Sequence, residues 1–376
     1  MRKVLIIASA LAALVGQPEV AFGANQKVLF SFNRPANHSD GVEPQGGVVV
    51  APDGQVFGTT LRGGGRADTG SIFGLDPSGA KLWQYSFGPH PTNGSTPVGQ
   101  LIIASDGNLY GVSHEGPLGG GAVYKISQAG QQYAIVYGFE DAFEDSPSFP
   151  ASGVIEANDG ALYGTTQHGG NGLQGTVFRL TLDGTMSVLH PFASDGSEGW
   201  LPQSSLLQAN DGRLYGVASG GGAAGHGTLF SVGLDGTFSV LHSFSSDEAS
   251  ASAGHSPLAQ LPDGALFGVT PDIAFKLDAT GRFTVLHRFG SQANNGLMPY
   301  SGLTLARDGY LYGTTLEGGA KLAKFGQYSG TVYRISESGK FTVVHSFGEG
   351  PGFDIGYNPA SERLGKVLYG RLPDRK

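Results

Sequence analysis

A sequence unit recurs seven times along the chain, in steps of 45 to 57 residues, and this repeat limits what the chain can fold into. Its central marker is Leu-Tyr-Gly or a close variant, and the marker's first residues are Val56, Leu109, Leu162, Leu214, Leu266, Leu311 and Leu368. Variants of Gly-x-x-Pro and of Val-Leu-His-Ser-Phe also occur once per unit, although the third unit has Pro147 where the glycine is expected. Because three separate markers agree, internal repetition is the organising feature of the sequence.

Each unit predicts four short β-strands. Strand a follows the proline, strand b carries Leu-Tyr-Gly, strand c carries Gly-Thr-Val-Phe, and strand d carries Val-Leu-His-Ser-Phe. Asp-Gly and similar pairs separate a from b and c from d, and such pairs are strong hairpin signals. Four-strand units at this period are typical of β-propellers. A parallel β-helix or a string of separate hairpins is the alternative, although a β-helix usually has shorter and more uniform coils.

The first and last repeats predict how the ring closes. The repeats begin with a strand d at residues 28–32 and stop after a strand b at residues 368–371. We therefore predict an all-β, seven-bladed β-propeller whose last blade is closed by the N-terminal strand. Because the sequence has no strand c for this blade, we expect it to be three-stranded or irregular. A chain shortened relative to its relatives is the competing explanation.

The N-terminus predicts export. Arg2 and Lys3 precede an uncharged run at residues 4–16, and Ala21-Phe22-Gly23 would suit signal peptidase. The apolar run is too short for a membrane span, which needs about 20 residues. We predict a signal peptide over 1–23 and one propeller domain over 24–376, in the periplasm, in the medium or at the cell surface. A buried N-terminal helix or strand is the alternative.

Composition narrows the classes of partner. The chain has no cysteine, so disulfides and thiol chemistry are excluded. With a net charge of −8, the chain lacks the positive electrostatic field that attracts nucleic acid or anionic membranes. The 63 glycines belong largely to the turns and loops of the repeat. We expect a monomer whose partner is a carbohydrate, a cell-envelope component or a protein, with no membrane insertion after signal removal.

The repeat sorts its connections into two kinds. The a–b and c–d connections are tight hairpins, nearly identical from unit to unit, whereas the b–c and d–a connections are longer and vary. In a four-stranded meander these two kinds emerge on opposite faces. Variable loops on a rigid scaffold commonly carry binding residues, so the face of b–c and d–a connections is the predicted functional face.

Residues that the repeat does not require are the candidate ligand-binding residues of this face. They are His114, His168 and His226 in the b–c loops of units two to four, Trp200 in a d–a loop, and Lys321 and Tyr328 in the b–c loop of unit six. The histidines could bind a metal or act as a general base, and an exposed Trp beside carboxylates suits sugar stacking. Ordinary solvated loops are the alternative. We expect the long unit-six loop to border a notch left by the short b–c link of unit five.

Other polar residues follow the repeat and therefore have a predicted structural role. The histidines at 190, 242, 287 and 345 share one position of strand d, on different blades, too far apart to share a metal. The Asp of each Asp-Gly pair suits a hairpin turn. Acidic loops could bind calcium, but no calcium motif with fixed spacing is present. The sequence therefore predicts no cofactor or metal and assigns no catalytic residue.

Three motifs carry a family resemblance: Leu-Tyr-Gly-Thr-Thr at 162–166 and 311–315, Gly-Thr-Val-Phe at 175–178, and Val-Leu-His-Ser-Phe at 240–244. Over residues 28–370 the repeat resembles the GloVer tandem-repeat family of exported bacterial proteins. The resemblance implies a propeller-like exported protein, and it brings no established catalytic residues.

Three functional interpretations follow. The first is an exported, non-catalytic binding or interaction module that uses the b–c and d–a face. The second is a secreted propeller enzyme, a polysaccharide lyase or hydrolase, with its site on the same face. The third is a purely structural surface protein. Fold alone does not decide between them. An enzyme should gather a His with two or more acids whose pKa values are shifted.

Overall fold

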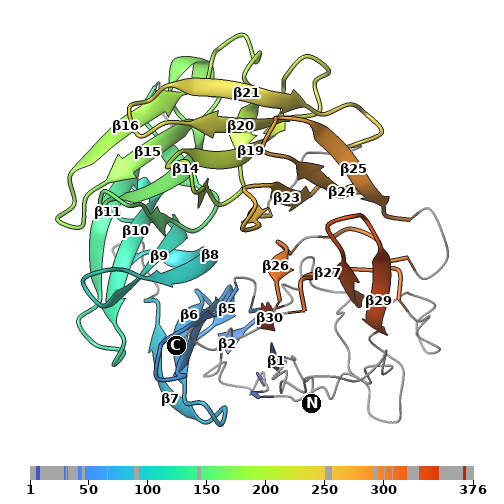
Figure 1. Cartoon of the computed structure of the whole chain (residues 1–376). Helices are drawn as coiled ribbons and strands as arrows, with labels where there is room; N and C mark the ends of the chain where they lie inside the picture. The colour runs from blue at the N-terminus through green and yellow to red at the C-terminus, as the bar shows by residue number, and fades with distance from the viewer. Residues whose placement is uncertain are drawn as a thin grey trace.

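Six antiparallel β-sheets of the predicted four-strand pattern follow one another along the chain, arranged around a common centre (Figure 1). The computed structural model describes residues 6–8, 29–30, 32, 41–44, 47–65, 67–88, 93–141, 145–249, 256–290, 295–299, 301–306, 308–319, 330–346 and 367–369. The last strand of each sheet lies at the periphery. The all-β propeller fold predicted from the repeat is confirmed.

The strands of each blade match the predicted order a, b, c, d. Blade 1 contains β3 (Val49–Val50), β4 (Val56–Thr60), β6 (Ser71–Leu75) and β7 (Lys81–Ser86), extended by the pair β2 (Gly41–Val42) and β5 (Arg62–Gly63). Blade 2 contains β8 (Ser95–Ile103), β9 (Asn108–Glu115), β10 (Gly119–Ser127) and β11 (Ala134–Glu140). Blade 3 contains β12 (Ser148–Pro150), β13 (Ile155–Glu156), β14 (Leu162–His168), β15 (Thr176–Leu180) and β16 (Met186–Pro191).

The second half of the described chain repeats this arrangement. Blade 4 contains β17 (Trp200–Pro202), β18 (Leu207–Gln208), β19 (Leu214–Gly220), β20 (Thr228–Val232) and β21 (Phe238–Ser243). Blade 5 contains β22 (Ala259–Gln260), β23 (Leu266–Val269), β24 (Ile273–Leu277) and β25 (Phe283–Arg288). Blade 6 contains β26 (Thr304–Leu305), β27 (Leu311–Thr315), β28 (Thr331–Ile335) and β29 (Phe341–Ser346). The 3-10 turn η2 (Asn171–Leu173) joins β14 to β15. In the described part of the chain, no helix has the length and apolarity to cross a membrane.

The Asp of each a–b turn has the structural role predicted for it. In blade 3, Asp159 accepts a hydrogen bond from the N–H of Ala161 at 3.1 Å and another from the hydroxyl of Tyr163 at 2.9 Å. The Tyr belongs to the Leu-Tyr-Gly marker, so the marker ties strand b to the turn before it. The same pair recurs in three other blades, as Tyr110–Asp106, Tyr215–Asp211 and Tyr312–Asp308.

The innermost strand turns sharply near the anchor proline. In blade 3, β12 and β13 are separate strands that both pair with β14, and blade 4 repeats this break. The residue before the proline has a left-handed backbone, with φ between 50° and 59°, at Glu43, Thr96, Phe149, Leu201 and Met298. This conformation is uncommon for residues other than glycine. It is nevertheless a regular part of this blade.

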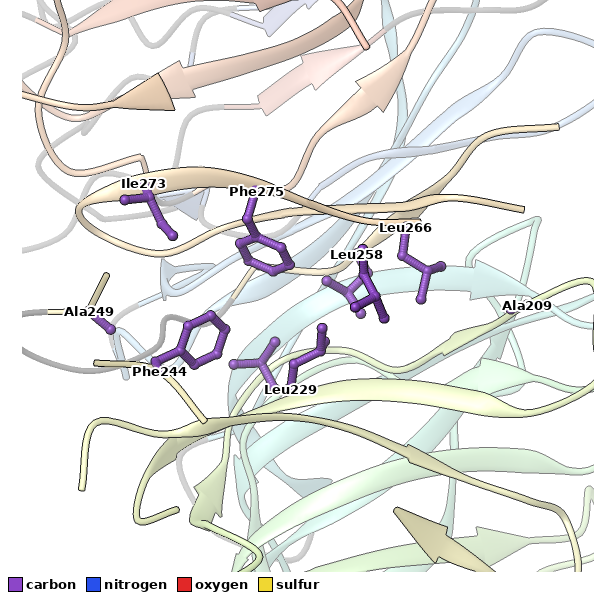
Figure 2. Packing of buried hydrophobic residues seen from close by; sticks show 10 residues of the cluster. Ala209, Leu229, Phe244, Ala249, Leu258, Leu266, Ile273 and Phe275 are labelled. Atoms are coloured by element: carbon purple, nitrogen blue, oxygen red, sulfur yellow. The ribbon is translucent and has the colours of Figure 1, made fainter. Parts of the chain in front are cut away.

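Five clusters of the hydrophobic core each join two consecutive blades. Strands b and c are buried on both faces, because a neighbouring blade packs on each side. At each junction between described blades, the Phe that follows one strand d packs on the strand-c ring of the next blade, with ring centroids 5.3–5.6 Å apart. Phe32 makes the same contact with Phe73 of blade 1, at 5.0 Å. Figure 2 shows one such junction, where Phe244 and Leu229 of blade 4 face Phe275 and Leu258 of blade 5. The blades therefore hold together by nearest-neighbour burial.

The repeated strand-d histidines stack between blades. His190, His242 and His287 lie against Phe238, Phe283 and Phe341 of the following blade, with centroids 3.6–4.1 Å apart. The Nε2 atoms of His190 and His242 lie 2.8 and 2.9 Å from the carboxylates of Glu198 and Glu248. Burial lowers the pKa of His287 to about 4, so this ring is neutral at physiological pH. The predicted structural role of these histidines is confirmed.

The prediction of seven blades is not supported, because the described residues form six. Closure would require residues 28–32 to join a sheet with residues 368–371. Instead, β30 (Val367–Tyr369) pairs in parallel with β1 (Ile6–Ala8). Residues 29, 30 and 32 form no strand, and they pack on blade 1, where Phe32 contacts Phe73. A three-stranded last blade is likewise absent from the described residues. β1 lies within the segment predicted as a signal peptide, which stays a prediction.

Candidate functional site

The two kinds of connection lie at opposite ends of the sheets, as predicted. In all six blades, the a–b and c–d turns are closed by a glycine N–H that donates to the carbonyl three residues earlier, at 2.8–3.1 Å. The b–c and d–a connections meet at the other end. There the segment before the anchor proline pairs with the end of strand b, as Ser148 does with His168. This end, called the variable face below, carries four of the predicted ligand-binding residues.

Two of the predicted histidines meet around one phenyl ring. Phe149 comes from β12 of blade 3, and its ring centroid lies 5.3 Å from that of His114 in blade 2 and 5.7 Å from that of His168 in its own blade. All three side chains are half-buried. The left-handed backbone of Phe149 places its ring at the junction of the two blades. Phe149 was not among the predicted residues, and it belongs to the one unit that lacks the Gly-x-x-Pro glycine.

Ser148, beside this cluster, has a buried hydroxyl, and the equivalent serine of blade 2 shows what such a hydroxyl can bind. Ser95 in blade 2 donates a hydrogen bond to Glu115, its partner in the β8–β9 register. Blade 3 has Ser148 and His168 at the same two positions, but the Ser148 hydroxyl is fully buried and has no hydrogen-bond partner among the described residues. The His168 ring turns instead to Phe149. The cluster is thus mainly aromatic, with imidazole nitrogens as its polar groups.

The other two described candidates lie together in blade 4. Trp200 is the first residue of β17, and its side chain is 37% exposed. A Cβ added at Gly221 would lie 2.9 Å from the indole Cε3, so the indole contacts this backbone. Gly221 also forms an isolated β-bridge with His226. The structure therefore divides the candidates into a His114–Phe149–His168 cluster and a Trp200–His226 cluster.

The remaining candidates, Lys321 and Tyr328, lie outside the described residues, as does most of the long blade-six loop. Of the two sides of the predicted notch, the described residues therefore include only the one formed by blade 5. There Thr270 closes a tight link, in which its N–H donates to the carbonyl of Ile273 at 2.9 Å. No group of three His, Asp or Glu residues within the described ranges could hold a metal ion.

Exposed apolar side chains concentrate on the variable face. The described residues contain eight exposed large hydrophobic side chains: Leu82, Leu118, Leu173, Val188, Trp200, Val240, Leu297 and Met298. Four of these eight lie in b–c or d–a connections and a fifth, Trp200, begins β17 at the same end of its sheet, so the five come from four different blades. The other three lie on the outer strands. The aliphatic members were not identified from the sequence, because a single Leu or Met in a loop has no repeat signature.

Comparison with known families identifies the repeat. The sequence model of the Gloeobacter/Verrucomicrobia repeat matches residues 20–155, 114–274 and 150–372, which together span nearly the whole chain. The chain belongs to this repeat family. The Leu-Tyr-Gly and Gly-Thr-Val-Phe motifs had predicted this membership. A comparison of the chain with curated proteins finds no match.

Solved structures share the fold at low sequence identity. A protein from Lactobacillus plantarum superposes with a TM-score of 0.54 at 15% identity, covering 80% of this chain and 84% of that one. A quinonprotein alcohol dehydrogenase-like protein from Bacteroides thetaiotaomicron gives 0.52 at 12% identity, covering 81% of this chain and 66% of that one. The extracellular domain of a candidate one-component system from B. thetaiotaomicron gives 0.52 at 11% identity. The match covers 80% of this chain but only 35% of that protein. These identities show a shared fold alone.

Proposed function

We propose that this repeat protein is an exported binding module that holds its ligand on the variable face. The observation that carries the proposal is the placement of five of the eight exposed large hydrophobic side chains on the variable face. Single exposed apolar residues are normal on protein surfaces. Here they share one face, and the repeat fixes none of them. A carbohydrate, a cell-envelope component or a protein partner would cover such a surface.

Export is part of the proposal. It is supported by the positively charged start and the short apolar run at residues 4–16. One of the fold neighbours is an extracellular domain, which agrees with a propeller outside the cytoplasm. A monomer that works without a cofactor or calcium, and without nucleic-acid or membrane partners, stays our prediction.

The enzyme alternative predicts a different arrangement. It requires a histidine that meets carboxylates on the variable face. Within the described residues, His190 and His242 each bond to a single carboxylate of a d–a connection, not to two or more acids, and both rings stack between blades. His114 and His168 contact a phenyl ring instead. The described contacts therefore favour binding over acid–base catalysis.

Co-sedimentation with envelopes of the producing bacterium tests the proposal. We expect the exported chain to bind, and the combined variant Leu118→Ser, Leu173→Asn and Met298→Asn to bind at least tenfold more weakly. Asn is chosen at positions 173 and 298 because their backbones are left-handed, with φ of 63° and 55°, and Asn tolerates this conformation.

A matched control removes exposed apolar side chains from the outer strands instead. The variant Leu82→Ser, Val188→Ser and Val240→Ser changes residues of similar exposure on β7, β16 and β21. It should bind like the wild type. Equal losses in the two variants, or no envelope binding by the wild type, would contradict the proposed function.

A further inference from the structure

The indole of Trp200 lies on a floor of glycine backbone. A Cβ added at Gly220 would lie 2.1 Å from the indole Nε1, one at Gly221 2.9 Å from Cε3, and one at Gly196 2.7 Å from Cζ3. A side chain at any of these positions would displace the ring. Gly220 ends β19 and pairs with Trp200, Gly221 follows it in the b–c connection, and Gly196 lies in the d–a connection, so two separate segments form the support. The indole thus has a covered side and an exposed side.

The propeller itself does not require a Trp at this position. Two residues before the anchor proline, other blades have Val42, Ser95, Ser148 and Leu297. The indole N–H of Trp200 donates to none of the described residues. Trp83, the second of the two tryptophans, differs in both respects, because its Nε1 donates to the carbonyl of Gln128 at 2.8 Å and its ring packs 5.8 Å from Phe57. Trp83 has a structural role, whereas Trp200 has an unused donor and an exposed surface.

Two polar residues belong to the loops that carry the glycines of this platform. Asp195 precedes Gly196 in the loop, and hydrogen bonds from the Ser197 hydroxyl and N–H hold the pKa of its exposed carboxyl below the usual value. Asp195 is therefore ionised at neutral pH and can accept further hydrogen bonds. His226 pairs with Gly221 through the backbone on the b–c side. An acceptor and an imidazole thus accompany the indole, on two different loops.

The loop that supports the platform is held in place from within. One oxygen of the Glu198 carboxylate lies 2.8 Å from His190 Nε2 and accepts a hydrogen bond from the N–H of Ala193 at 3.0 Å. The hydroxyl of Thr228 donates to the carbonyl of Glu198 at 2.7 Å. Because these contacts fix the segment before Trp200, little conformational entropy is lost when a ligand settles on the ring.

We propose that Trp200 is the stacking platform of a carbohydrate subsite that accepts a pyranose ring of a polysaccharide. This inference rests on the proposed binding function and names its ligand class. The C–H groups of a pyranose form a flat apolar face of about the size of an indole, while its hydroxyls need hydrogen-bond partners at the rim. Trp supplies such a rigid apolar surface together with one polar handle. The indole N–H, the Asp195 carboxylate and the His226 imidazole are the partners for the hydroxyls, which fix the sugar's orientation.

Binding of defined sugars tests this inference. A glycan array with the exported chain comes first, followed by calorimetric titration with cellohexaose and chitohexaose. We expect Trp200→Ala to weaken sugar binding at least tenfold. Gly220→Ala should do the same with the Trp still present, because its methyl group would occupy the place of the indole, and its backbone conformation is open to Ala. Gly88→Ala, where the nearest atom to an added Cβ is 3.6 Å away, should leave binding unchanged.

Fluorescence gives an independent readout. The variant Trp83→Phe leaves Trp200 as the only tryptophan, so sugar stacking should change its emission directly. Sugar binding that survives Trp200→Ala in a folded protein would overturn the inference. So would the absence of any array signal. If envelope binding persists in that case, the carbohydrate subsite is wrong and the proposed binding function stands.

Discussion

Two tyrosines carry hydroxyls that the fold does not use. Tyr124 and Tyr333 occupy the strand-c ring position, are fully buried, and have hydroxyls without a hydrogen-bond partner among the described residues. The other four blades have Phe at this position, as Phe73, Phe178, Phe230 and Phe275. Burial raises the pKa of both tyrosines, which are therefore neutral. A buried hydroxyl without a partner costs about 1–3 kcal/mol.

We predict that Tyr333→Phe stabilises the protein by about 1 kcal/mol, because it removes an unsatisfied polar atom and leaves the ring in place. Urea unfolding monitored by circular dichroism measures the change. The matched variant Tyr163→Phe removes a hydroxyl that donates to Asp159 at 2.9 Å and accepts from Arg179 at 3.1 Å. It should destabilise the protein by a similar amount. Loss of stability in both variants would show that the Tyr333 hydroxyl is satisfied.

Only part of the candidate site could be predicted from single residues of the sequence. Trp200 could be selected because the repeat does not demand it. The three glycines beneath its indole could not be selected in this way. Glycine is common throughout the chain, and nothing in the sequence marks Gly196, Gly220 and Gly221 as neighbours. The pairing of His114 with His168 through Phe149 was also out of reach, because it depends on packing between two blades.

At the scale of elements, a repeated hydrogen bond joins the a–b turn of one blade to the innermost strand of the next. The N–H of Asn158 in blade 3 donates to the side-chain oxygen of Gln208 in blade 4 at 2.8 Å. Equivalent bonds join Ser105 to Glu156 and Asn210 to Gln260. Where the donor position is a proline, as at Pro52 and Pro262, the next blade has an apolar residue, Ile103 or Leu305. Proline has no N–H, so an acceptor there would be unused.

This complementarity predicts a coupling between the two positions. Asn158→Pro should destabilise the protein by about 1 kcal/mol, because it removes the donor and leaves the Gln208 oxygen unpaired. Adding Gln208→Leu should recover part of that loss, because the double variant reproduces the Pro262–Leu305 combination. A double-mutant cycle of urea unfolding measures the interaction free energy, which we expect to be about 0.5–1 kcal/mol. Strictly additive effects would contradict the coupling.

The elements themselves were largely predictable, and the exceptions have physical reasons. Strands b, c and d follow from local signals, the Asp-Gly turns and the alternating apolar residues. The break in strand a was not foreseen, because the residue before a proline normally prefers an extended backbone. At Phe149 and four equivalent positions it is left-handed instead. Tertiary pairing with strand b outweighs the local preference.

At the scale of the whole molecule, the blade count was the main error. Counting strand markers assumes that every copy joins a sheet. The copies at 28–32 and 368–371 lack a strand c between them, so no local pairing brings them together. In the structure, Phe32 keeps the contact that each strand d makes with the following blade, while β30 pairs elsewhere. Phe32 thus packs on the next blade as a strand d would, although its segment does not pair into a sheet.

The junction clusters also predict how stability is distributed through the propeller. Each cluster joins consecutive blades, so a defect at one junction should destabilise mainly the two blades beside it, as in repeat proteins whose stability depends on nearest-neighbour interfaces.

Phe244→Ala should lower the free energy of unfolding by about 3–5 kcal/mol, because it empties a fully buried site between blades 4 and 5. Hydrogen exchange should then quicken in β19–β21 and β23–β25, while β8–β11 keep their protection. Val240→Ala, on the same strand but 39% exposed, should change little. An equal loss of protection in all six blades would instead mean that the ring unfolds as one cooperative unit.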